Sequence, residues 1–268
     1  MFWTRLISGA VLLLILVIAI VSGGWVLWGL CLAISLIGLF ELYRVFGFEK
    51  KLLAAAGYAA VCFYYLNLQM RWITDDMIMV ICFMLLLLCF YVGTYPAFRA
   101  KQIAEAYFGV FYVAVMLSFI FQIRIPAGGF YNTWLIFICA WGCDTCAYCA
   151  GMLFGKHKFV PRLSPKKTVE GAVGGIVGAA LIGSIYGTVL FAEFDYPAAR
   201  IGACAIICGL GALIAQVGDL AASAIKRNYD VKDYGHLIPG HGGILDRFDS
   251  VILTAPMIYA LTQLLVRQ

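Results

Sequence analysis

Residues 6–22 read LISGAVLLLILVIAIVS, a run in which Ser8 and Ser22 are the only polar side chains. An apolar run of this length is what an α-helix needs to cross the hydrocarbon of a bilayer. It begins directly after Arg5 and lacks the small-residue cleavage site of a secretory signal, so we interpret it as a retained span. This stretch predicts an integral membrane protein.

The composition of the whole chain agrees with this interpretation. Of 268 residues, 64% are hydrophobic and only 12% are charged, and the mean hydropathy is +0.95. Soluble domains carry about 25% charged residues, so this chain could not cover a water-facing surface. In lipid only helices and closed barrels satisfy the backbone, and long unbroken apolar runs favour helices. We therefore predict an all-α, polytopic transmembrane helix bundle of about nine spans. The expected spans are 6–22, 25–43, 52–69, 76–95, 104–122, 132–153, 171–191, 200–222 and 250–266.

The placement of positive charge predicts the orientation. The net charge is +5, which in a soluble protein would suggest nucleic acid, but in a membrane protein Lys and Arg accumulate in cytoplasmic loops. With the N-terminus in the cytoplasm, fifteen of the nineteen Lys and Arg lie inside. The four outside are Arg71, Arg124, Arg200 and Arg267. We expect a multi-pass protein of the cell (inner) membrane, with a cytoplasmic N-terminus, Gln268 outside and no nucleic-acid partner.

Two cytoplasmic loops stand out by their length and charge. They are 154–170 and 223–250, and both belong to the region 131–268, which we interpret as a catalytic membrane-helix region that follows an N-terminal membrane-helix region, 1–130. Long polar loops on a rigid scaffold are where binding and catalysis concentrate.

The ten cysteines do not predict disulfides, because most lie inside apolar spans. Cys143, Cys146 and Cys149 superficially resemble an iron–sulfur run, but no fourth cysteine follows in the required context. We interpret them as small residues that pack helices.

Two carboxylates interrupt apolar spans: Asp144 in WGCDTCAY and Asp219 in QVGDLAAS. A carboxylate at membrane depth is costly unless it is paired, hydrated or bound to a metal. Either each pairs with a base from another segment, or each belongs to a cation or substrate site. Ser223, Lys226 and Arg227 share the helical face of Asp219, which suits a metal bound next to phosphates.

The loop that follows reads PGHGG over 239–243, with Asp246, Arg247 and Asp249 after it. Glycines allow a close backbone approach to a ligand and offer N–H groups to an anion. Two carboxylates beside bases fit Mg²⁺ held by oxygen ligands and shared with phosphates. The alternative is an ordinary helix start, with Asp246 as its N-terminal cap.

The segment SPKKTVEG, residues 164–171, leads into a span with glycines at 171, 174, 175 and 178. Lys166 and Lys167 could grip phosphate at the helix entrance, or could form a basic patch attracted to anionic lipid. The glycine spacing predicts close helix packing. His157, His236 and His241 match no zinc spacing, so we expect solvated or structural roles for them.

Taken together, the polar positions of 223–249 resemble the defining motif of the phosphatidate cytidylyltransferases, or CDP-diacylglycerol synthases. The pattern runs S-x2-K-R-x4-K-D-x5-P-G-H-G-G-x2-D-R-x-D without a departure. Residues 144–148 and 164–171 are similar to upstream family blocks. The resemblance implies transfer of CMP from CTP to phosphatidic acid in the membrane, giving CDP-diacylglycerol and pyrophosphate, with one or two Mg²⁺ ions.

The resemblance and the residue chemistry together give a candidate site. The expected metal ligands are Asp144, Asp219, Asp246 and Asp249. The expected catalytic residues are Lys167, Ser223, Lys226, Arg227 and Arg247. The expected phosphate-binding residues are Lys166, Lys167, Lys226, Arg227, Lys232, Gly242, Gly243 and Arg247.

Two other functions compete with this one. A cation transporter would use intramembrane Asp144 and Asp219, but it leaves the polar 223–250 loop without a role. Another Mg²⁺-dependent lipid-linked nucleotidyl or phosphosugar transferase is the alternative among enzymes. The sequence leaves open the acyl-chain preference, CTP against dCTP, and the oligomeric state, a homodimer included.

Overall fold

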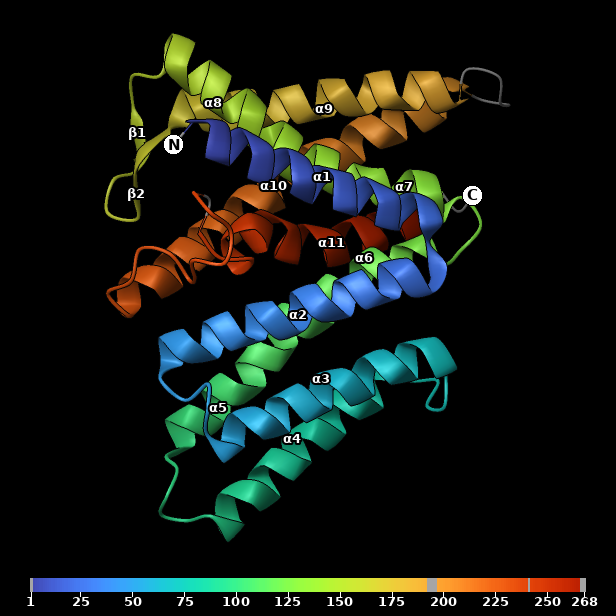
Figure 1. The fold of residues 1–268 in the computed structure, drawn as a ribbon. Coiled ribbons are helices and arrows are strands. Elements are labelled where there is room, and N and C mark those ends of the chain that lie inside the picture. The colour runs from blue at the N-terminus through green and yellow to red at the C-terminus, as the bar shows by residue number, and fades with distance from the viewer. Residues whose placement is uncertain (1, 192–196, 241, 266–268) are drawn as a thin grey trace. The chain divides into compact units, whose positions relative to one another are not determined.

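The computed structural model describes residues 2–191, 197–240 and 242–265 (Figure 1). His241, Arg267 and Gln268, on which the sequence analysis made predictions, lie outside the described residues. Helices make up most of the fold, and the described β-structure is one two-stranded sheet.

Within the residues that the structure describes, nine helical segments follow one another. The first four are α1 (Phe2–Ser22), α2 (Gly24–Phe46), α3 (Leu52–Met70) and α4 (Asp76–Gly93). The next two each continue through a wide π-helical turn: α5–η1–α6 (Ala100–Gly109, Val110–Val115, Met116–Arg124) and α7–η2–α8 (Gly129–Phe137, Ile138–Gly142, Cys143–Phe154). The last three are α9 (Val169–Phe191), α10 (Pro197–Asn228) and α11 (Leu245–Leu265).

The predicted all-α polytopic bundle is confirmed. Within the described residues seven helical segments are long and apolar enough to cross a membrane, and Leu6–Ser22 and Met77–Gly93 are shorter apolar helices. These nine coincide with the nine predicted spans. The cytoplasmic position of the N-terminus stays a prediction.

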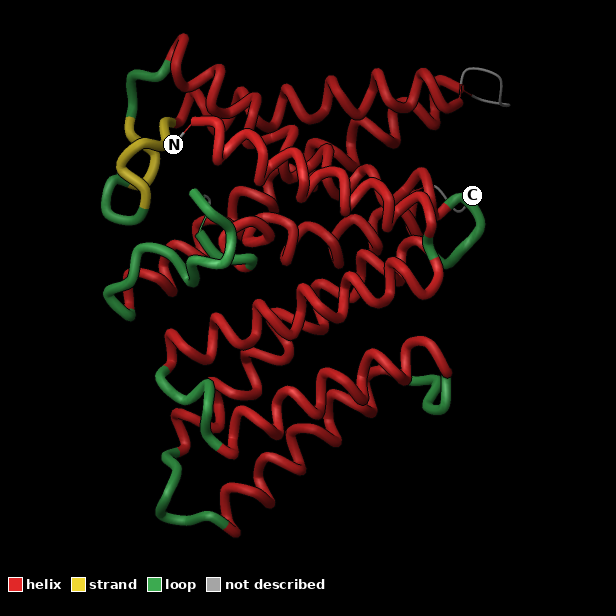
Figure 2. Tube along the Cα trace, viewed as in Figure 1, coloured by secondary structure: helices red, strands yellow, loops and turns green. Residues whose placement is uncertain are grey.

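The two predicted loops are shorter and more ordered than expected. In 154–170 the chain forms an antiparallel hairpin, β1 (Lys158–Val160) with β2 (Ser164–Thr168), drawn in yellow in Figure 2. In 223–250, α10 continues to Asn228 and α11 begins at Leu245, so only 229–244 is irregular. Lys226 and Arg227 in the last turn of α10, and Asp246 in the first turn of α11, suit the helix dipoles.

Two compact units divide the chain. Unit 1 comprises Met1–Phe121 and Tyr229–Arg247, and unit 2 comprises Gln122–Asn228 and Phe248–Gln268. This division differs from the sequence-based regions 1–130 and 131–268, because the segment after α10 returns to the N-terminal unit. This irregular segment, residues 229–244, contains the PGHGG sequence and is called the glycine loop below; it therefore belongs to unit 1.

In unit 1, α2 lies against α3 and against the α5–η1 helix (Figure 1). Tyr43 of α2 is fully buried, and its hydroxyl donates a 2.8 Å hydrogen bond to the carbonyl of Ala106. A Cβ added at Gly57 or at Gly109 would overlap the Tyr43 ring. Small residues on two helices thus make room for one large aromatic side chain.

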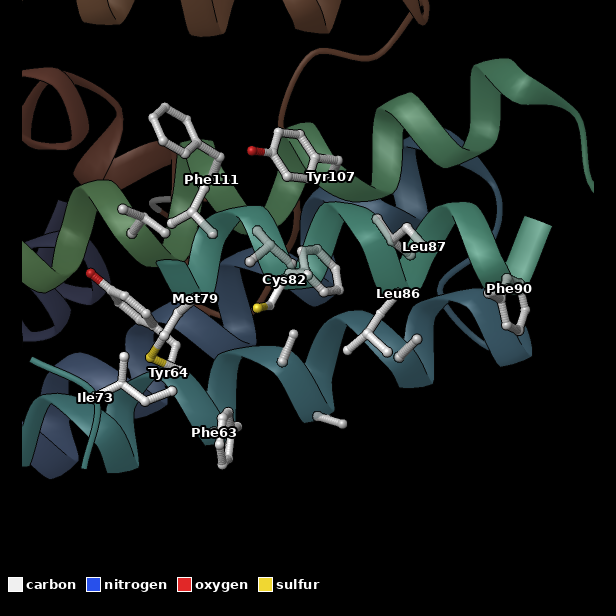
Figure 3. Close-up of a pocket in the computed structure, with 17 residues that line it drawn as sticks. Phe63, Tyr64, Ile73, Met79, Cys82, Leu86, Leu87, Phe90, Tyr107 and Phe111 are labelled. Atoms are coloured by element: carbon white, nitrogen blue, oxygen red, sulfur yellow. The ribbon is translucent and has the colours of Figure 1, made fainter. Parts of the chain in front are cut away.

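An apolar cavity of about 550 Å³ lies among α3, α4 and the α5–η1 helix. Figure 3 shows Phe63 and Tyr64 of α3, Met79 of α4 and Phe111 of η1 around it. The described side chains that line it carry no charge. It offers no chemistry for a phosphate or a metal.

In unit 2, α9 packs between α8 and α10. A Cβ added at Gly174 would overlap Ala150, and one at Gly178 would overlap Cys146. Cys143 is fully buried against α10, where its thiol lies 3.7 Å from the carbonyl oxygen of Ala212. The predicted packing role is confirmed for these glycines and for Cys143 and Cys146, whereas Cys149 is exposed.

Candidate active site

A pocket of about 330 Å³ opens in unit 2 between α8, β2, α9 and α10. The π-helical turn η2 runs directly into α8 and places Asp144 in the first turn of that helix, on the pocket wall. π-helical turns inside helices are frequent at functional sites. The pocket is lined by Asp144, Ala147, Tyr148, Gly151, Met152, Lys166, Lys167, Thr168, Gly171, Ala172 and Gln216.

The β1–β2 hairpin carries the two lysines to this pocket. Its base is tied by Glu170 in the first turn of α9, whose carboxylate accepts hydrogen bonds from the backbone N–H groups of Lys156 (3.1 Å) and His157 (3.2 Å). The Nδ1 atom of His157 lies 2.6 Å from Glu170 Oε1. His157 therefore has the structural role that the sequence analysis expected.

Lys167 forms an ion pair with Asp219 of α10. The hydroxyl of Ser223, one turn further along α10, donates to Asp219 Oδ1 at 3.5 Å. Both members of the ion pair are half-buried. Asp219 thus pairs with a base from another segment, and that base also lines the pocket, while a role of Asp219 in a cation or substrate site stays a prediction.

Asp249 stands opposite the same face of α10. A Cβ added at Gly218 would lie 2.9 Å from the Asp249 carbonyl oxygen, so α10 and α11 approach closely here only because residue 218 is glycine. The Asp249 carboxylate lies 4.0 Å from Lys226 Nζ, and these side chains are 14% and 12% exposed. It also interacts electrostatically with Asp219 and Asp144. Asp249 is therefore a third carboxylate near Asp219 and Asp144, and it is largely buried.

Sequence reasoning missed Gln216, which lies one helical turn before Asp219. Its side-chain amide is buried and donates to the carbonyl of Ala172 on α9 at 2.9 Å. It holds α9 and α10 in register beneath the pocket. A polar residue three positions before Asp219 in an apolar span was the available signal.

In unit 1 the glycine loop closes on Asp246. Asp246 Oδ2 accepts hydrogen bonds from the backbone N–H groups of Tyr234 (2.8 Å) and Gly243 (3.0 Å). Gly240 and Gly242 have φ of +78° and +86°, a backbone region that favours glycine. Asp246 is thus a buried acceptor for its own loop, and it lies inside the first turn of α11 instead of at the N-terminal cap position considered from sequence.

Glu41 is the second residue that sequence reasoning missed. It lies on α2 and is 2% exposed, and its two carboxylate oxygens accept hydrogen bonds from Ile244 N–H (3.0 Å) and Leu245 N–H (2.8 Å). A Cβ added at Gly235 or Gly243 would collide with this carboxylate. In this structure the backbone N–H groups of the loop and of the start of α11 therefore donate to two of the protein's own carboxylates, Asp246 and Glu41. An acid within an apolar span was the signal that could have revealed Glu41.

The start of the loop is fixed by Tyr229. Its hydroxyl donates to the carboxylate of Glu105, which also pairs with Lys101 at 3.5 Å. Partial removal from water, and then the bond to Glu105, raise the pKa of Tyr229 to about 12. The phenol therefore stays protonated, and remains a donor, at neutral pH.

The remaining predicted positions lie at the surface. Arg227 lies in the last turn of α10, Lys232 in the glycine loop and Arg247 in the first turn of α11, and all three are exposed. The phosphate-binding roles of Gly242 and Gly243 stay predictions, since the Gly243 N–H donates to Asp246 in this structure. Over the described ranges, no three His, Cys, Asp or Glu side chains are close enough to share one metal ion.

Comparison with known proteins places the chain in a family. Residues 3–265 match the Cytidylyltransferase family. The chain therefore belongs to the cytidylyltransferase family, and it is a multi-pass membrane protein.

Named relatives are similar over nearly the full length. A phosphatidate cytidylyltransferase of Bacillus subtilis is 31% identical, covering 97% of both chains. One of Staphylococcus haemolyticus is 30% identical over 95% of this chain and 96% of its own. One of Rickettsia bellii is 44% identical over 48% of this chain and 57% of its own.

Proposed function

We propose that this chain transfers the cytidylyl group of CTP to phosphatidate, giving CDP-diacylglycerol and pyrophosphate. Its full-length relatives bear the name phosphatidate cytidylyltransferase. The observation that carries the proposal is the ion pair of Lys167 with Asp219 beside a pocket in unit 2, together with the pair of Lys226 on α10 and Asp249 on α11. Cationic side chains neutralise the charge of two polyanionic substrates, and carboxylates beside them can hold a metal ion that does the same.

The reaction needs little proton chemistry. An oxygen of the phosphatidate monoester attacks the α-phosphorus of CTP, and the bond from that phosphorus to the bridging oxygen breaks and releases pyrophosphate. The second pKa of a phosphate monoester is about 6, so the nucleophile is largely ionised at neutral pH. The difficulty is repulsion between anions, and catalysis then rests on positioning and charge neutralisation.

The lysines supply part of that neutralisation. Lys166 and Lys167 enter the pocket from β2, and Lys226 enters the group from the last turns of α10. Fixed cations of this kind stabilise charge on transferring phosphoryl groups. Ser223, hydrogen-bonded to Asp219, orients that carboxylate next to Lys167.

The donor set of unit 2 fits Mg²⁺. Asp144, Asp219 and Asp249 offer the hard carboxylate oxygens that Mg²⁺ prefers, and the ion binds in such sites through one or two carboxylates plus substrate phosphates. Asp219 and Asp249 would hold it, with Asp144 beside them, and a ligand role for Asp246, which belongs to unit 1, stays a prediction. When bound, the ion neutralises phosphate charge and orients the leaving group.

The membrane is the natural location for this chemistry. We propose the cell (inner) membrane, with the hairpin and the glycine loop on the cytoplasmic side, where CTP and the lipid headgroup can both reach the site. A homodimer stays a prediction that light scattering of the detergent-solubilised protein can check.

One assay tests the proposed reaction. Purified protein in detergent would be given phosphatidate, Mg²⁺ and each of the four nucleoside triphosphates in turn. We expect CDP-diacylglycerol and pyrophosphate in equal amounts, and only with the cytidine nucleotide. Turnover with a different nucleotide, or pyrophosphate without a lipid product, would refute the assignment.

A further inference from the structure

A second pocket, of about 540 Å³, lies in unit 1 at the end of α2 where the glycine loop passes. The proposed reaction described above assigns no role to the residues of this pocket. Its lining is Leu36, Ile37, Phe40, Glu41, Arg44, His236 and Leu237.

The polarity of this pocket changes along α2. Leu36, Ile37 and Phe40 form an apolar wall, and Arg44 lies in the last turn of the helix. Eight residues of α-helix separate Leu36 from Arg44, which is about 12 Å along the axis. The pocket is therefore apolar at membrane depth and cationic at the membrane edge. A glycerophospholipid has the same order, from acyl chains to phosphate.

The charge at the edge is available to an anion. Within the described part of the chain no carboxylate forms an ion pair with Arg44, whose guanidinium stacks 4.7 Å from the centre of the Phe40 ring. Glu41, the acid on the same pocket wall, directs both oxygens to the backbone of Ile244 and Leu245. His236 is exposed on the loop side of the pocket. A guanidinium with free donors is suited to phosphate oxygens.

We propose that this pocket binds phosphatidate, with Arg44 and His236 at the phosphate and Leu36, Ile37 and Phe40 along the first part of an acyl chain. The inference rests on the proposed function, because it names phosphatidate as the lipid that the enzyme uses. The apolar wall favours a lipid over free nucleotide, whose triphosphate and ribose would leave it unfilled. The monoester phosphate also carries more charge than the diester headgroup of phosphatidylcholine. His236 and Leu237 belong to the glycine loop, whose end is held in place by the hydrogen bonds to Glu41.

Photo-crosslinking tests the site without using turnover. The full chain in nanodiscs would be exposed to phosphatidate, diacylglycerol or phosphatidylcholine, each with a photoreactive group near the carboxyl end of one acyl chain. We expect phosphatidate to label the peptide that holds residues 36–40, and Arg44→Gln to reduce that labelling about tenfold, as loss of a charge-assisted hydrogen bond implies. The matched control is Lys50→Gln, at an exposed cation six positions away, which should leave the labelling unchanged.

Kinetics provide the second measurement. Arg44→Gln should raise KM for phosphatidate about tenfold and leave KM for CTP within about twofold, with Arg44→Lys recovering part of the loss. Equal labelling by diacylglycerol, or unchanged labelling in Arg44→Gln, would overturn the proposal, and so would a raised KM for CTP alone. If the unaltered protein makes no CDP-diacylglycerol, the proposed function fails, and crosslinking still decides whether the pocket binds the lipid. A thermal melt of each variant separates these results from misfolding.

Discussion

Glu41 and Leu245, 204 positions apart in the sequence, are joined by a 2.8 Å hydrogen bond from the Leu245 N–H to the Glu41 carboxylate. The other carboxylate oxygen accepts the N–H of Ile244 at 3.0 Å. The first N–H groups of a helix have no partner within the helix. A buried acid on α2 therefore serves as the cap for α11 and sets where the glycine loop ends.

Replacing Glu41 should lower the free energy of unfolding, because its carboxylate holds the backbone at the start of α11. Glu41→Ala leaves two buried N–H groups without an acceptor, and each such loss costs about 1–3 kcal/mol. Glu41→Gln keeps the volume but turns an NH₂ donor toward one of these N–H groups, so it should also destabilise. Denaturant titration of the detergent-solubilised protein would measure the free energy of unfolding.

Glu49→Gln is the matched control for this prediction. Its side chain accepts none of the hydrogen bonds in the described structure, although it lies near the same end of α2. Unchanged unfolding of Glu41→Ala would show that the carboxylate does not hold the loop in solution.

The carboxylates of unit 2 should bind metal. Asp219→Asn and Asp249→Asn are each expected to abolish turnover while the protein still folds, because asparagine keeps the size and loses the charge. Added Mg²⁺ should raise the melting temperature of the unaltered protein, since a ligand that binds only the folded state stabilises it. Both variants should lose that rise.

Asp230→Asn is the control for the metal prediction, since Asp230 is an exposed loop residue outside the proposed site. It should keep both activity and the Mg²⁺-dependent rise. If Asp219→Asn or Asp249→Asn keeps near-normal activity at saturating Mg²⁺, that residue is not a ligand.

The two exposed arginines of the motif should bind phosphate through paired donors. Arg227→Lys and Arg247→Lys retain the charge but lose the planar fork, so we expect a loss of about tenfold in kcat/KM. A loss in kcat alone would place the contact in the transition state, and a rise in KM alone would indicate uniform binding. Full activity in both conservative variants would reduce them to charges that set topology.

Topology gives an independent prediction. Single cysteines introduced into a cysteine-free variant at Arg162 and Lys232 should react only with reagents that enter the cytoplasm. A cysteine at Arg124 should react from outside. A reporter fused after Gln268 should also report the outer side. A cytoplasmic C-terminus would overturn the nine-span interpretation.

Much of the architecture could be predicted because lipid imposes simple rules. Each predicted span coincides with a helix, since apolar length decides both. The four α9 glycines at 171, 174, 175 and 178 face α8 and pack closely there, as their spacing indicated. The hairpin was not predicted, because its five-residue strand, SPKKT, shows no apolar alternation and its partner has three residues.

The sequence indicated which residues belong to the candidate site, but it did not indicate which of them contact one another. Sequence put Lys167 and Asp219 in one candidate set, but only tertiary structure joins them as an ion pair. The acid within an apolar span was a signal for Glu41, but its partners are backbone N–H groups, so no second residue type in the sequence points to its role. The return of residues 229–247 to unit 1 likewise depends on contacts such as Tyr229 with Glu105, which no local pattern encodes.

The dependence of turnover on pH tests whether the phosphate of phosphatidate attacks directly or needs a general base from the protein. If phosphatidate attacks directly, the group that must lose a proton is its own phosphate, so the rate should rise with an apparent pKa of about 6, shifted by nearby cations. Below that value the monoanion is the weaker nucleophile, and above it the dianion is present and the rate levels off.

His241, the motif histidine, which lies outside the described residues, is the alternative general base. His241→Gln removes its titration and keeps hydrogen-bonding capacity, so we expect a loss of less than about tenfold and an unchanged acid limb. His236→Gln is no matched control here, since His236 belongs to the proposed lipid pocket, whereas His157→Gln alters the hairpin base and should also leave the acid limb in place. A loss of about 10²–10⁴-fold in His241→Gln, together with a flattened limb, is the signature of a removed general base. That result would assign the proton transfer to His241 and reject direct attack by the lipid phosphate.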